Sequence, residues 1–507
     1  MGIILSVKFK NIIKKSKSFF TVKALKRAPR REISLCFLPQ WSVNQPPIGI
    51  AYLTAYLKKQ NFKVHQRDLS IEMYSRLPED KKYICESFYH ENFLSYERFN
   101  TSVAKEVLPF IDEWAEELAS SRSPFIGFTI LSSNKIPTLI IIEKIKKMAP
   151  EKIIIVGGPH CTRYEGGFDL IENYPIDYLI PDEGEEVLYE LLDALCAGKN
   201  NSEIKQIPGI LFKNDEISSG DKETQIEVIK GISISKSNSV TDTGNRPMIK
   251  QINDLPIPVF YDFKLKSYKQ LTLPILGSRG CIYKCAFCSE TVLWKRYRFR
   301  TGKNLFEEFK TQFETTGSQS YYIVDSLING NIKELILLCD HLIESGLKVY
   351  WGGKASIRKQ MTKEVLEKMH QAGCRNLDYG IESGSPKILV DMKKGYEIPT
   401  ATEVLRDSSN AGIQVGIFMM VGFPTEDEID YNLSKKFLID HKEWIHHVTP
   451  GYGFGIQPGS DTFINREKYG IIMKDNDWYS EHVTPEIRNF RVHDFRKFCV
   501  EIGLVIT

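Results

Sequence analysis

The sequence predicts an α/β protein in which a doubly wound parallel sheet is followed by a partial (β/α)6 barrel. The chain has 507 residues, which is more than a single hydrophobic core usually holds. From residue 33 onwards, short apolar segments alternate with amphipathic segments of helical period, a pattern typical of parallel sheets. The alternation stops between about residues 198 and 260, where the composition becomes polar, and then starts again. We therefore expect two α/β domains joined by a linker.

The first domain is expected to be doubly wound. Its strands are predicted at residues 33–38, 125–131, 152–156 and 178–180. Pro47 and Gly49 open a helix after the first strand, and later helices cover 137–148 and a segment that ends near residue 195. Glycines follow the third strand at Gly157 and Gly158, where a ligand could approach the backbone closely.

The linker is expected to contain a short hairpin. Residues 209–212 and 216–219 can pair across the polar turn Lys213-Asn214-Asp215, because apolar segments flank turn residues there. The linker ends in the sequence Asp-Leu-Pro-Ile-Pro at 254–258.

The second domain repeats the strand and helix alternation six times. Strands are predicted near 273–276, 321–324, 348–351, 376–379, 415–421 and 447–452. Gly346, Gly373 and Gly412 each stand just before the next strand, as expected of the left-handed residue after a helix. Six such units predict a partial TIM barrel, with functional residues at the carboxyl ends of its strands.

These patterns give the expected organisation of the whole chain. It consists of a basic N-terminal tail (1–31), the doubly wound domain (32–198), the linker (199–262), the barrel (263–464) and a C-terminal extension (465–507).

The composition indicates a cytoplasmic protein. Hydrophobic residues make up 42% and charged residues 26%, and no apolar run approaches the roughly 20 residues that span a bilayer. The cysteines show no paired framework of the secreted type, which favours a reducing compartment. The first 31 residues are basic without any acid, so weak contact of this tail with an anionic membrane surface is one interpretation and a solvated tail is the other. The rest is mildly acidic, and no nucleic-acid partner is expected.

Three cysteines form the one tight group of potential ligands. Cys281, Cys285 and Cys288 lie within eight residues, directly after the first expected barrel strand. Three thiolates at this spacing can hold a [4Fe-4S] cluster and leave one iron without a protein ligand. A zinc site is the alternative, but it needs a fourth Cys or His at suitable spacing, and the next histidine is His341. The spacing favours the cluster.

The cysteine motif resembles that of the radical S-adenosylmethionine superfamily, CxxxCxΦC, with Phe287 at the aromatic position. The resemblance extends over the second half of the chain. It implies that S-adenosylmethionine chelates the open iron, and that the reduced cluster cleaves it to a 5′-deoxyadenosyl radical. It also implies an electron donor of the flavodoxin or ferredoxin type.

Further residues of the second half match this resemblance in order. Asp325 ends the second strand, where the superfamily often carries Gly-Gly-Glu, and is expected to receive the methionine amino group; a helix cap is its alternative role. Glu382 and Ser383 follow the fourth strand and resemble the ribose and carboxylate contact. Arg358 follows the third strand and is expected to meet an anionic group of the cosubstrate, or to be a surface residue.

The first half resembles the cobalamin-binding module of one large radical S-adenosylmethionine branch. The matching segments are residues 46–53, 156–160, 182–186 and the Asp-Leu-Pro-x-Pro linker. The resemblance implies a Rossmann-like fold that binds cobalamin. The expected cobalamin contacts are Pro47, Ser132, Ser133, Gly157, Gly158, Glu183 and Gly184. The chain has no Asp-x-His-x-x-Gly sequence, so a histidine ligand to cobalt is not expected. The alternative is a domain that kept the fold and lost the cofactor.

Together, these resemblances imply a cobalamin-dependent methyltransferase that acts on an unactivated carbon, or on phosphorus, of a small molecule or peptide. One S-adenosylmethionine would methylate cobalamin and a second would supply the radical. The alternatives are cobalamin-independent cyclisation, rearrangement or methylthiolation, and a non-catalytic module that retains a cluster or metal. Methylthiolation would require clustered cysteines in the first half, whereas Cys36, Cys85, Cys161 and Cys196 are dispersed.

Overall fold

The structure is a computed structural model. It describes residues 29–164, 166–214, 224–229, 232–450, 453–474 and 477–507. Most of the expected basic tail, and the second half of the hairpin expected at 216–219, lie outside the described residues.

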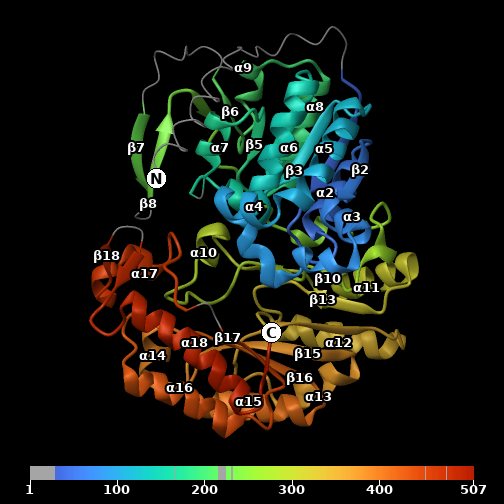
Figure 1. The fold of residues 1–507 in the computed structure, drawn as a ribbon. Helices are drawn as coiled ribbons and strands as arrows, with labels where there is room; N and C mark the ends of the chain where they lie inside the picture. Colours follow the sequence, from blue (N-terminus) through green and yellow to red (C-terminus); the bar gives the residue numbers. More distant parts are fainter. Residues whose placement is uncertain (1–28, 165, 215–223, 230–231, 451–452, 475–476) are drawn as a thin grey trace.

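The first sheet has seven strands in the order β2-β1-β3-β4-β5-β6-β9 and occupies the upper part of Figure 1. The first five strands are parallel, and β6 and β9 are added antiparallel. The 2-1-3-4-5 order confirms the doubly wound prediction and puts a topological switch point between β1 and β3. The strands are β1 (Glu32–Phe37), β2 (Lys63–Asp68), β3 (Phe125–Thr129), β4 (Ile153–Gly157), β5 (Tyr178–Ile180), β6 (Leu211–Lys213) and β9 (Val240–Asp242).

Helices pack on both faces of this sheet, as the helical pattern predicts. They are α2 (Ile48–Lys59), α3 (Leu69–Arg76), α4 (Tyr96–Ser102), α5 (Ala104–Ser120), α6 (Lys135–Met148), α7 (Gly167–Asn173), α8 (Gly184–Cys196) and α9 (Asn201–Ile204). A separate hairpin, β7 (Thr224–Ile229) with β8 (Ile232–Ser237), follows β6.

Two features of the first sheet differ from the expectation. Strand β2 was not predicted, because its sequence KVHQRD is polar and its buried residues include Gln66 and Asp68. The segment around β6 was expected to form a local hairpin. Instead β6 pairs with β5 and β9, so the first part of the expected linker extends the sheet.

The second sheet also has seven strands, in the order β10-β13-β14-β15-β16-β17-β20. All its pairings are parallel. The strands are β10 (Leu273–Ile275), β13 (Ser320–Ile323), β14 (Tyr350–Ala355), β15 (Cys374–Glu382), β16 (Gln414–Met419), β17 (His447–Pro450) and β20 (Val505–Ile506). The first six confirm the predicted barrel units. The seventh, β20, comes from the expected C-terminal extension and is too short to give a sequence signal.

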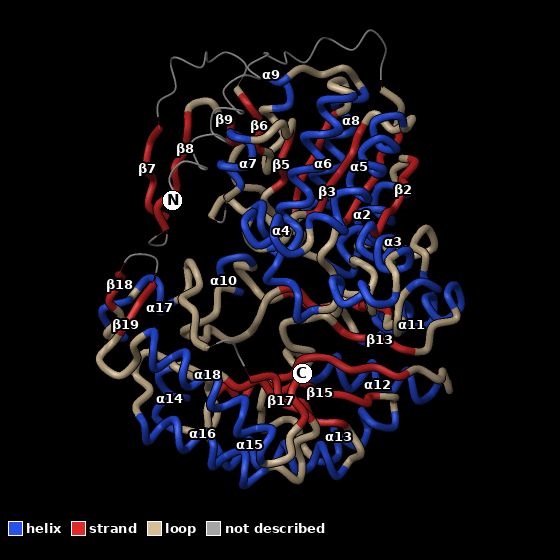
Figure 2. Tube along the Cα trace, in the orientation of Figure 1, coloured by secondary structure: helices blue, strands red, loops and turns tan. Residues whose placement is uncertain are grey.

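Helices surround this sheet on its outer side, while the strands lie toward the first unit (Figure 2). The helices of this unit are α10 (Glu290–Leu293), α11 (Gly302–Thr316), α12 (Ile332–Ser345), α13 (Lys363–Gln371), α14 (Pro386–Asp391), α15 (Ile398–Asn410), α16 (Glu428–His441), α17 (Asp461–Ile464) and α18 (Pro485–Glu501). The short helix α10 is an exception to the outer position, because it lies between the two units (Figure 2). Two small antiparallel pairs complete the fold, β11 (Ser278–Arg279) with β12 (Arg298–Phe299) and β18 (Ile472–Lys474) with β19 (Asp477–Tyr479). Gly346, Gly373 and Gly412 all have positive φ, as expected of residues that end helices.

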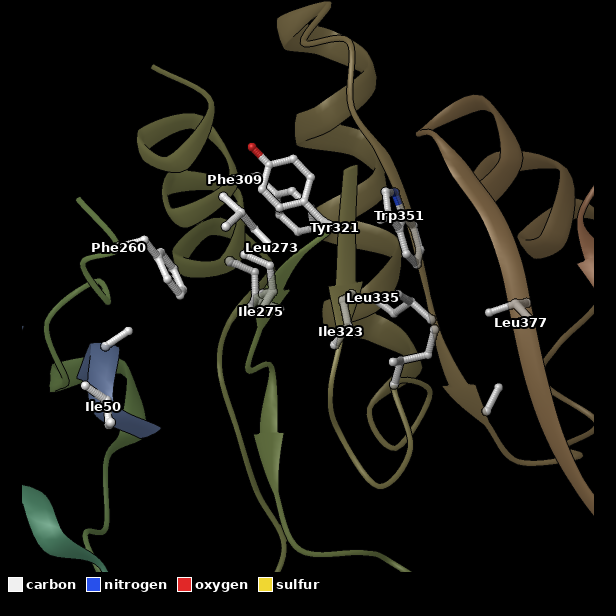
Figure 3. Packing of buried hydrophobic residues seen from close by; sticks show 14 of the residues in the cluster. Ile50, Phe260, Leu273, Ile275, Phe309, Tyr321, Ile323, Leu335, Trp351 and Leu377 are labelled. Carbon is white, nitrogen blue, oxygen red and sulfur yellow. The ribbon is translucent and has the colours of Figure 1, made fainter. Parts of the chain in front are cut away.

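One hydrophobic cluster runs through both halves of the molecule. It contains Ile50 from α2 together with Leu273 and Tyr321 from the second sheet. Figure 3 shows Ile50 and Phe260 near the barrel residues that they join. The two units therefore share part of their core, and their relative placement is stabilised by apolar burial.

Within the described ranges, none of the helices combines the length and the apolar character that crossing a bilayer requires.

Candidate functional site

A cavity of about 580 Å³ lies between the carboxyl ends of the two sheets. Phe37, Thr129 and Gly157, at the ends of β1, β3 and β4, line it from one side, and Ser278 and Asp325, after β10 and β13, line it from the other. In open α/β sheets, ligands bind outside the carboxyl ends of the strands at the switch point, and barrels bind them at the same end. The fold therefore directs two ligand-binding edges into one space.

Five of the expected cobalamin contacts line this cavity. They are Pro47, Gly157, Gly158, Glu183 and Gly184. Gly49 lines it as well, and a Cβ added there would meet nothing within 4 Å. Ser132 and Ser133 are not part of the lining; the Ser133 hydroxyl donates to the carbonyl of Gln40 at 3.1 Å instead.

The cysteine loop follows β11 at the edge of this cavity, where the preceding Gly280 is one of the lining residues. The backbone N–H of Tyr283 donates to Sγ of Cys281, and that of Glu290 to Sγ of Cys288, each at 3.4 Å. Such N–H···S bonds stabilise thiolate ligands. Burial raises the pKa of all three thiols, that of Cys288 to about 11, and a bound metal centre reverses this because it deprotonates its thiol ligands.

The three thiols match the donor set of a cluster. Cys281, Cys285 and Cys288 are all partly buried on one loop, and a [4Fe-4S] cluster takes its thiolates on separate irons. The zinc alternative would need a fourth ligand around a single centre.

Glu382 lies at a backbone irregularity at the end of β15. Its φ is 69°, and the pairing with β16 shifts register between Gly380 and Glu382. Lys394, whose side chain is buried, is 3.3 Å from the Glu382 carboxylate and stands 5.8 Å from the ring of Phe287. Strained residues of this kind occur at ligand sites. Glu382 and Phe287 together line a second, open cavity of about 800 Å³.

Lys394 was not singled out from the sequence. Its positive charge acts on Cys285 and Cys281 and opposes the rise of their pKa that burial causes. It follows α14 in a segment with no motif, and only the fold brings it to the thiols. A buried cation beside the loop suits a centre that carries negative thiolates.

Asp325 is buried against the strand end that precedes the cysteines. Its carboxylate accepts from the N–H of Gly277 at 2.7 Å and from the hydroxyl of Ser278 at 2.6 Å. Burial raises its pKa to about 7. The carboxylate can accept further hydrogen bonds in addition to these two, and Asp325 lines the cavity. An ammonium group bound in the cavity could therefore donate to it.

Ser383 and Arg358 do not reach either cavity. The Ser383 hydroxyl is fully buried and lies 3.2 Å from that of Ser434 on α16. The Arg358 guanidinium donates to the carbonyls of Asn329 and Gly330. Both side chains thus support the strand-end loops. Arg358 also lines a further pocket, which it shares with Tyr283 of the cysteine loop, and the expected contacts of both residues with the cosubstrate stay predictions.

A buried ion-pair network joins the two units at the wall of the cavity. Arg279 on β11 pairs with Glu183 and Glu185 from the first unit, and Arg298 on β12 binds Glu183 at 2.8 Å. Arg279, Glu183 and Glu185 are each less than 10% exposed in their side chains. The sequence suggested a cofactor role for Glu183, but it did not reveal the arginines, because they lie about 100 residues away in the chain.

A second buried network lies nearby. Tyr52 on α2 donates to Glu308 on α11 at 3.3 Å, and Arg300 binds both. Burial raises the pKa of Glu308, and the guanidinium opposes that rise. The two networks fix the cavity walls relative to each other.

The family model of the radical SAM superfamily matches residues 275–438. An uncharacterised methyltransferase of Pyrococcus horikoshii is 24% identical over 459 residues, which are 87% of this chain and 86% of that protein. The anaerobic magnesium-protoporphyrin IX monomethyl ester cyclase of Cereibacter sphaeroides is 24% identical over 331 residues. The matched segment covers 62% of this chain and 49% of that protein.

Solved structures share the fold over most of the chain. The radical S-adenosylmethionine methyltransferase TsrM from Kitasatospora setae, with cobalamin and a [4Fe-4S] cluster bound, has a TM-score of 0.63 at 17% identity and covers 87% of this chain and 76% of its own. The cobalamin-dependent enzyme OxsB has a TM-score of 0.66 at 16% identity, covering 92% of this chain and 66% of its own. At these identities the likeness establishes the two-unit fold.

Proposed function

We propose that this chain, a radical S-adenosylmethionine enzyme of the branch with an N-terminal cobalamin-binding domain, methylates an unactivated carbon of a small molecule or peptide. The observation that carries the proposal is the cavity of about 580 Å³ onto which both sheets direct their carboxyl ends. A methyl carrier in the first unit and a radical source in the second would there reach the same acceptor.

The donor set fits the cofactors. Cys281, Cys285 and Cys288 would hold the [4Fe-4S] cluster, and the lining that contains Gly157 and is open at Gly49 would admit cobalamin. When bound, the reduced cluster with S-adenosylmethionine supplies a 5′-deoxyadenosyl radical and cobalamin supplies the methyl group.

The protein's own residues would bind and orient these groups. Asp325 would accept a hydrogen bond from the ammonium of S-adenosylmethionine, and Glu382, which pairs with Lys394, would accept hydrogen bonds from its ribose hydroxyls. Apolar lining residues such as Trp41, Leu131 and Leu276 would exclude water, which protects a reactive radical from side reactions.

The proposal includes an electron donor of the flavodoxin or ferredoxin type and a cytoplasmic location. A cluster held by three thiolates has to be reduced from outside before each radical is formed, and the free cysteines of the chain are compatible with a reducing compartment.

Radical cyclisation without a cobalamin step is the second candidate. It is supported by the similarity to the magnesium-protoporphyrin IX monomethyl ester cyclase over 331 residues. A cyclase would form 5′-deoxyadenosine without S-adenosylhomocysteine, because no methyl group leaves the cosubstrate.

Anaerobic reconstitution of the full chain with iron, sulfide and hydroxocobalamin tests the proposal. We expect about four irons per chain, a retained cobalamin spectrum, and release of both 5′-deoxyadenosine and S-adenosylhomocysteine under reduction. Nucleoside without retained cobalamin would leave a radical enzyme but contradict methyl transfer. One zinc and no cleavage would contradict the radical chemistry itself.

Gly49→Phe should block the cobalamin side of the cavity. A Cβ at Gly49 points into open space, so the new ring would enter the cavity while the helix itself tolerates the change. We expect cobalamin retention to fall about tenfold or more, since overpacking costs on the order of 1–3 kcal/mol. Iron content and nucleoside release should persist. Gly49→Ala is the control, and equal cobalamin retention in both variants would place the cofactor elsewhere.

A further inference from the structure

The cysteine loop contributes to three cavities, each through a different residue. Gly280, directly before Cys281, lines the cavity between the two sheets, and Phe287 lines the open cavity that also contains Glu382. Tyr283 lines a third cavity, of about 690 Å³, which shares no lining residue with the other two. The proposed function places cofactors and cosubstrate in the first two, so the third is the side of the loop that is left for another molecule.

This third cavity is directly connected to the thiols. The backbone N–H of Tyr283 donates to Sγ of Cys281 at 3.4 Å, and a Cβ added at Gly395, another lining residue, would be 3.7 Å from the Tyr283 ring. The N–H of Ala286 donates to the carbonyl of Met392 at 2.9 Å. A molecule bound in this cavity would therefore contact the loop that carries the thiolates.

The surroundings of the third cavity are basic. Arg358 and Lys359 line it, and Lys284, the residue after Tyr283, is exposed. Lys393 lines it too, but its charge is balanced by Asp461 at 2.8 Å. Even with the exposed Glu397 in the lining, the net charge of this region is positive, which attracts an acidic partner.

Apolar side chains are exposed among these charges. Val390 on α14 lines the cavity and is 76% exposed, and Ile282 of the cysteine loop is 39% exposed. Exposed apolar side chains within a charged rim are typical of surfaces that bind proteins.

The positive groups suit a protein better than a small anion. The Arg358 guanidinium donates to the carbonyls of Asn329 and Gly330, and Lys393 is paired with Asp461. These groups do not converge on one point, as the clamp of a small anion would. Instead they give the surface a positive potential, which steers the approach of a large charged partner.

We propose that this region is the docking face for an acidic protein that delivers single electrons to the cluster. The docking face consists of Ile282, Tyr283, Lys284, Arg358, Lys359 and Val390. In the transfer, the partner's redox centre is oxidised by one electron, the [4Fe-4S] cluster is reduced by one electron, and no bond is made or broken. The inference rests on the proposed function, since it takes the three thiolates to hold a cluster that is reduced from outside.

The test follows the oxidation of a reduced plant-type [2Fe-2S] ferredoxin, an acidic protein, by the reconstituted full chain. Stopped-flow absorbance gives the second-order rate constant at low ionic strength and again with added salt. The same chain is reduced in parallel by photoreduced deazaflavin, a small uncharged reductant that needs no docking face. We expect the wild-type rate with ferredoxin to fall as salt is added, because screening weakens the attraction between opposite charges. The rate with deazaflavin should not respond to salt.

Two variants alter the docking face. Lys359→Glu reverses one of its charges, and Val390→Glu places an acid at its exposed apolar residue. Each should lower the ferredoxin rate constant by about threefold to tenfold and leave iron content and the deazaflavin rate unchanged. The matched controls are Lys348→Glu and Val500→Glu. Lys348 is an exposed lysine before the amino end of β14, whereas Lys359 follows its carboxyl end, and Val500 is 64% exposed on α18.

Equal ferredoxin rates in all four variants, or a wild-type rate that does not depend on salt, overturn the inference. An equal loss with both reductants overturns it as well, because the substitutions would then disturb the cluster and not the docking. A wild-type chain that holds no cluster contradicts the proposed function instead. Line broadening of ¹⁵N-labelled oxidised ferredoxin by the full chain needs no electron transfer and still decides the docking face: Lys359→Glu should abolish the broadening, and Lys348→Glu should not.

Discussion

Cys285→Ala should abolish the cluster and all radical chemistry. Iron after anaerobic reconstitution should fall from about four per chain to less than about one, because two remaining thiolates cannot retain a [4Fe-4S] cluster that has only three protein ligands. Release of 5′-deoxyadenosine should fall below detection. Cobalamin retention should survive, since Cys285 is not among the residues that line the cavity between the two sheets.

The matched control for this loss is Cys196→Ala. Cys196 is a partly exposed free cysteine at the end of α8, far from the loop in sequence, so its removal should leave iron and nucleoside release unchanged. Full iron content in Cys285→Ala would mean that the cluster is held by other residues. Iron loss in both variants would point to a fold that depends generally on its thiols.

Arg279→Leu should lower the free energy of unfolding by about 3–5 kcal/mol, the usual cost of leaving buried charges without their partner. The substitution leaves the neighbouring carboxylates Glu183 and Glu185 of the first unit without the guanidinium that binds both of them across the interface, and Arg298 compensates Glu183 only. Chemical denaturation of the two proteins measures the difference. Arg31→Leu is the control: Arg31 pairs with Asp193 at the surface, where removal of an ion pair costs roughly 0–1 kcal/mol.

The pH dependence of this difference in the free energy of unfolding shows whether lost charge or lost packing causes it. Burial by itself would raise the pKa of Glu183. The positive charges of Arg279 and Arg298 have the larger effect, so the pKa of Glu183 is lowered. A carboxyl with a lowered folded pKa contributes stability above its unfolded pKa of about 4.3, and loses it as the pH falls through the folded pKa. The gap between wild type and Arg279→Leu should therefore be largest near neutral pH and shrink below about pH 4. A gap that is constant with pH would indicate lost packing, not lost charge.

The sequence predicted the features that depend on neighbours in the chain. Strand and helix alternation is local, so the first six barrel strands and the sheet around β1, β3, β4 and β5 were predicted. The cysteine loop is likewise contiguous. Pro47, Gly157 and Asp325 were predicted as ligand contacts because they follow strand ends, and the structure places all three in the lining of one cavity. That the two sheets share this cavity was not predicted.

What the sequence did not predict depends on contacts between distant segments. Neither Arg279 nor Lys394 was assigned a role from the sequence. Only the fold shows that Arg279 pairs with Glu183 and that Lys394 pairs with Glu382. Ser132 and Ser133 follow a strand, yet the local chain direction keeps them out of the cavity lining. Position after a strand thus predicts the correct edge of a sheet but not the direction of an individual side chain.

The continuity of the core between the two units limits how the chain can be recombined. Ile50 and Tyr52 on α2 contribute to the interior of the second unit, through the shared apolar cluster and the contact with Glu308. A barrel expressed from residue 263 would expose that apolar face and leave Arg279 without its carboxylates. Chimeras that exchange barrels between proteins of this plan should therefore transfer α2 and the segment 183–185 together with the barrel, because a junction in the linker alone separates residues that are buried against one another.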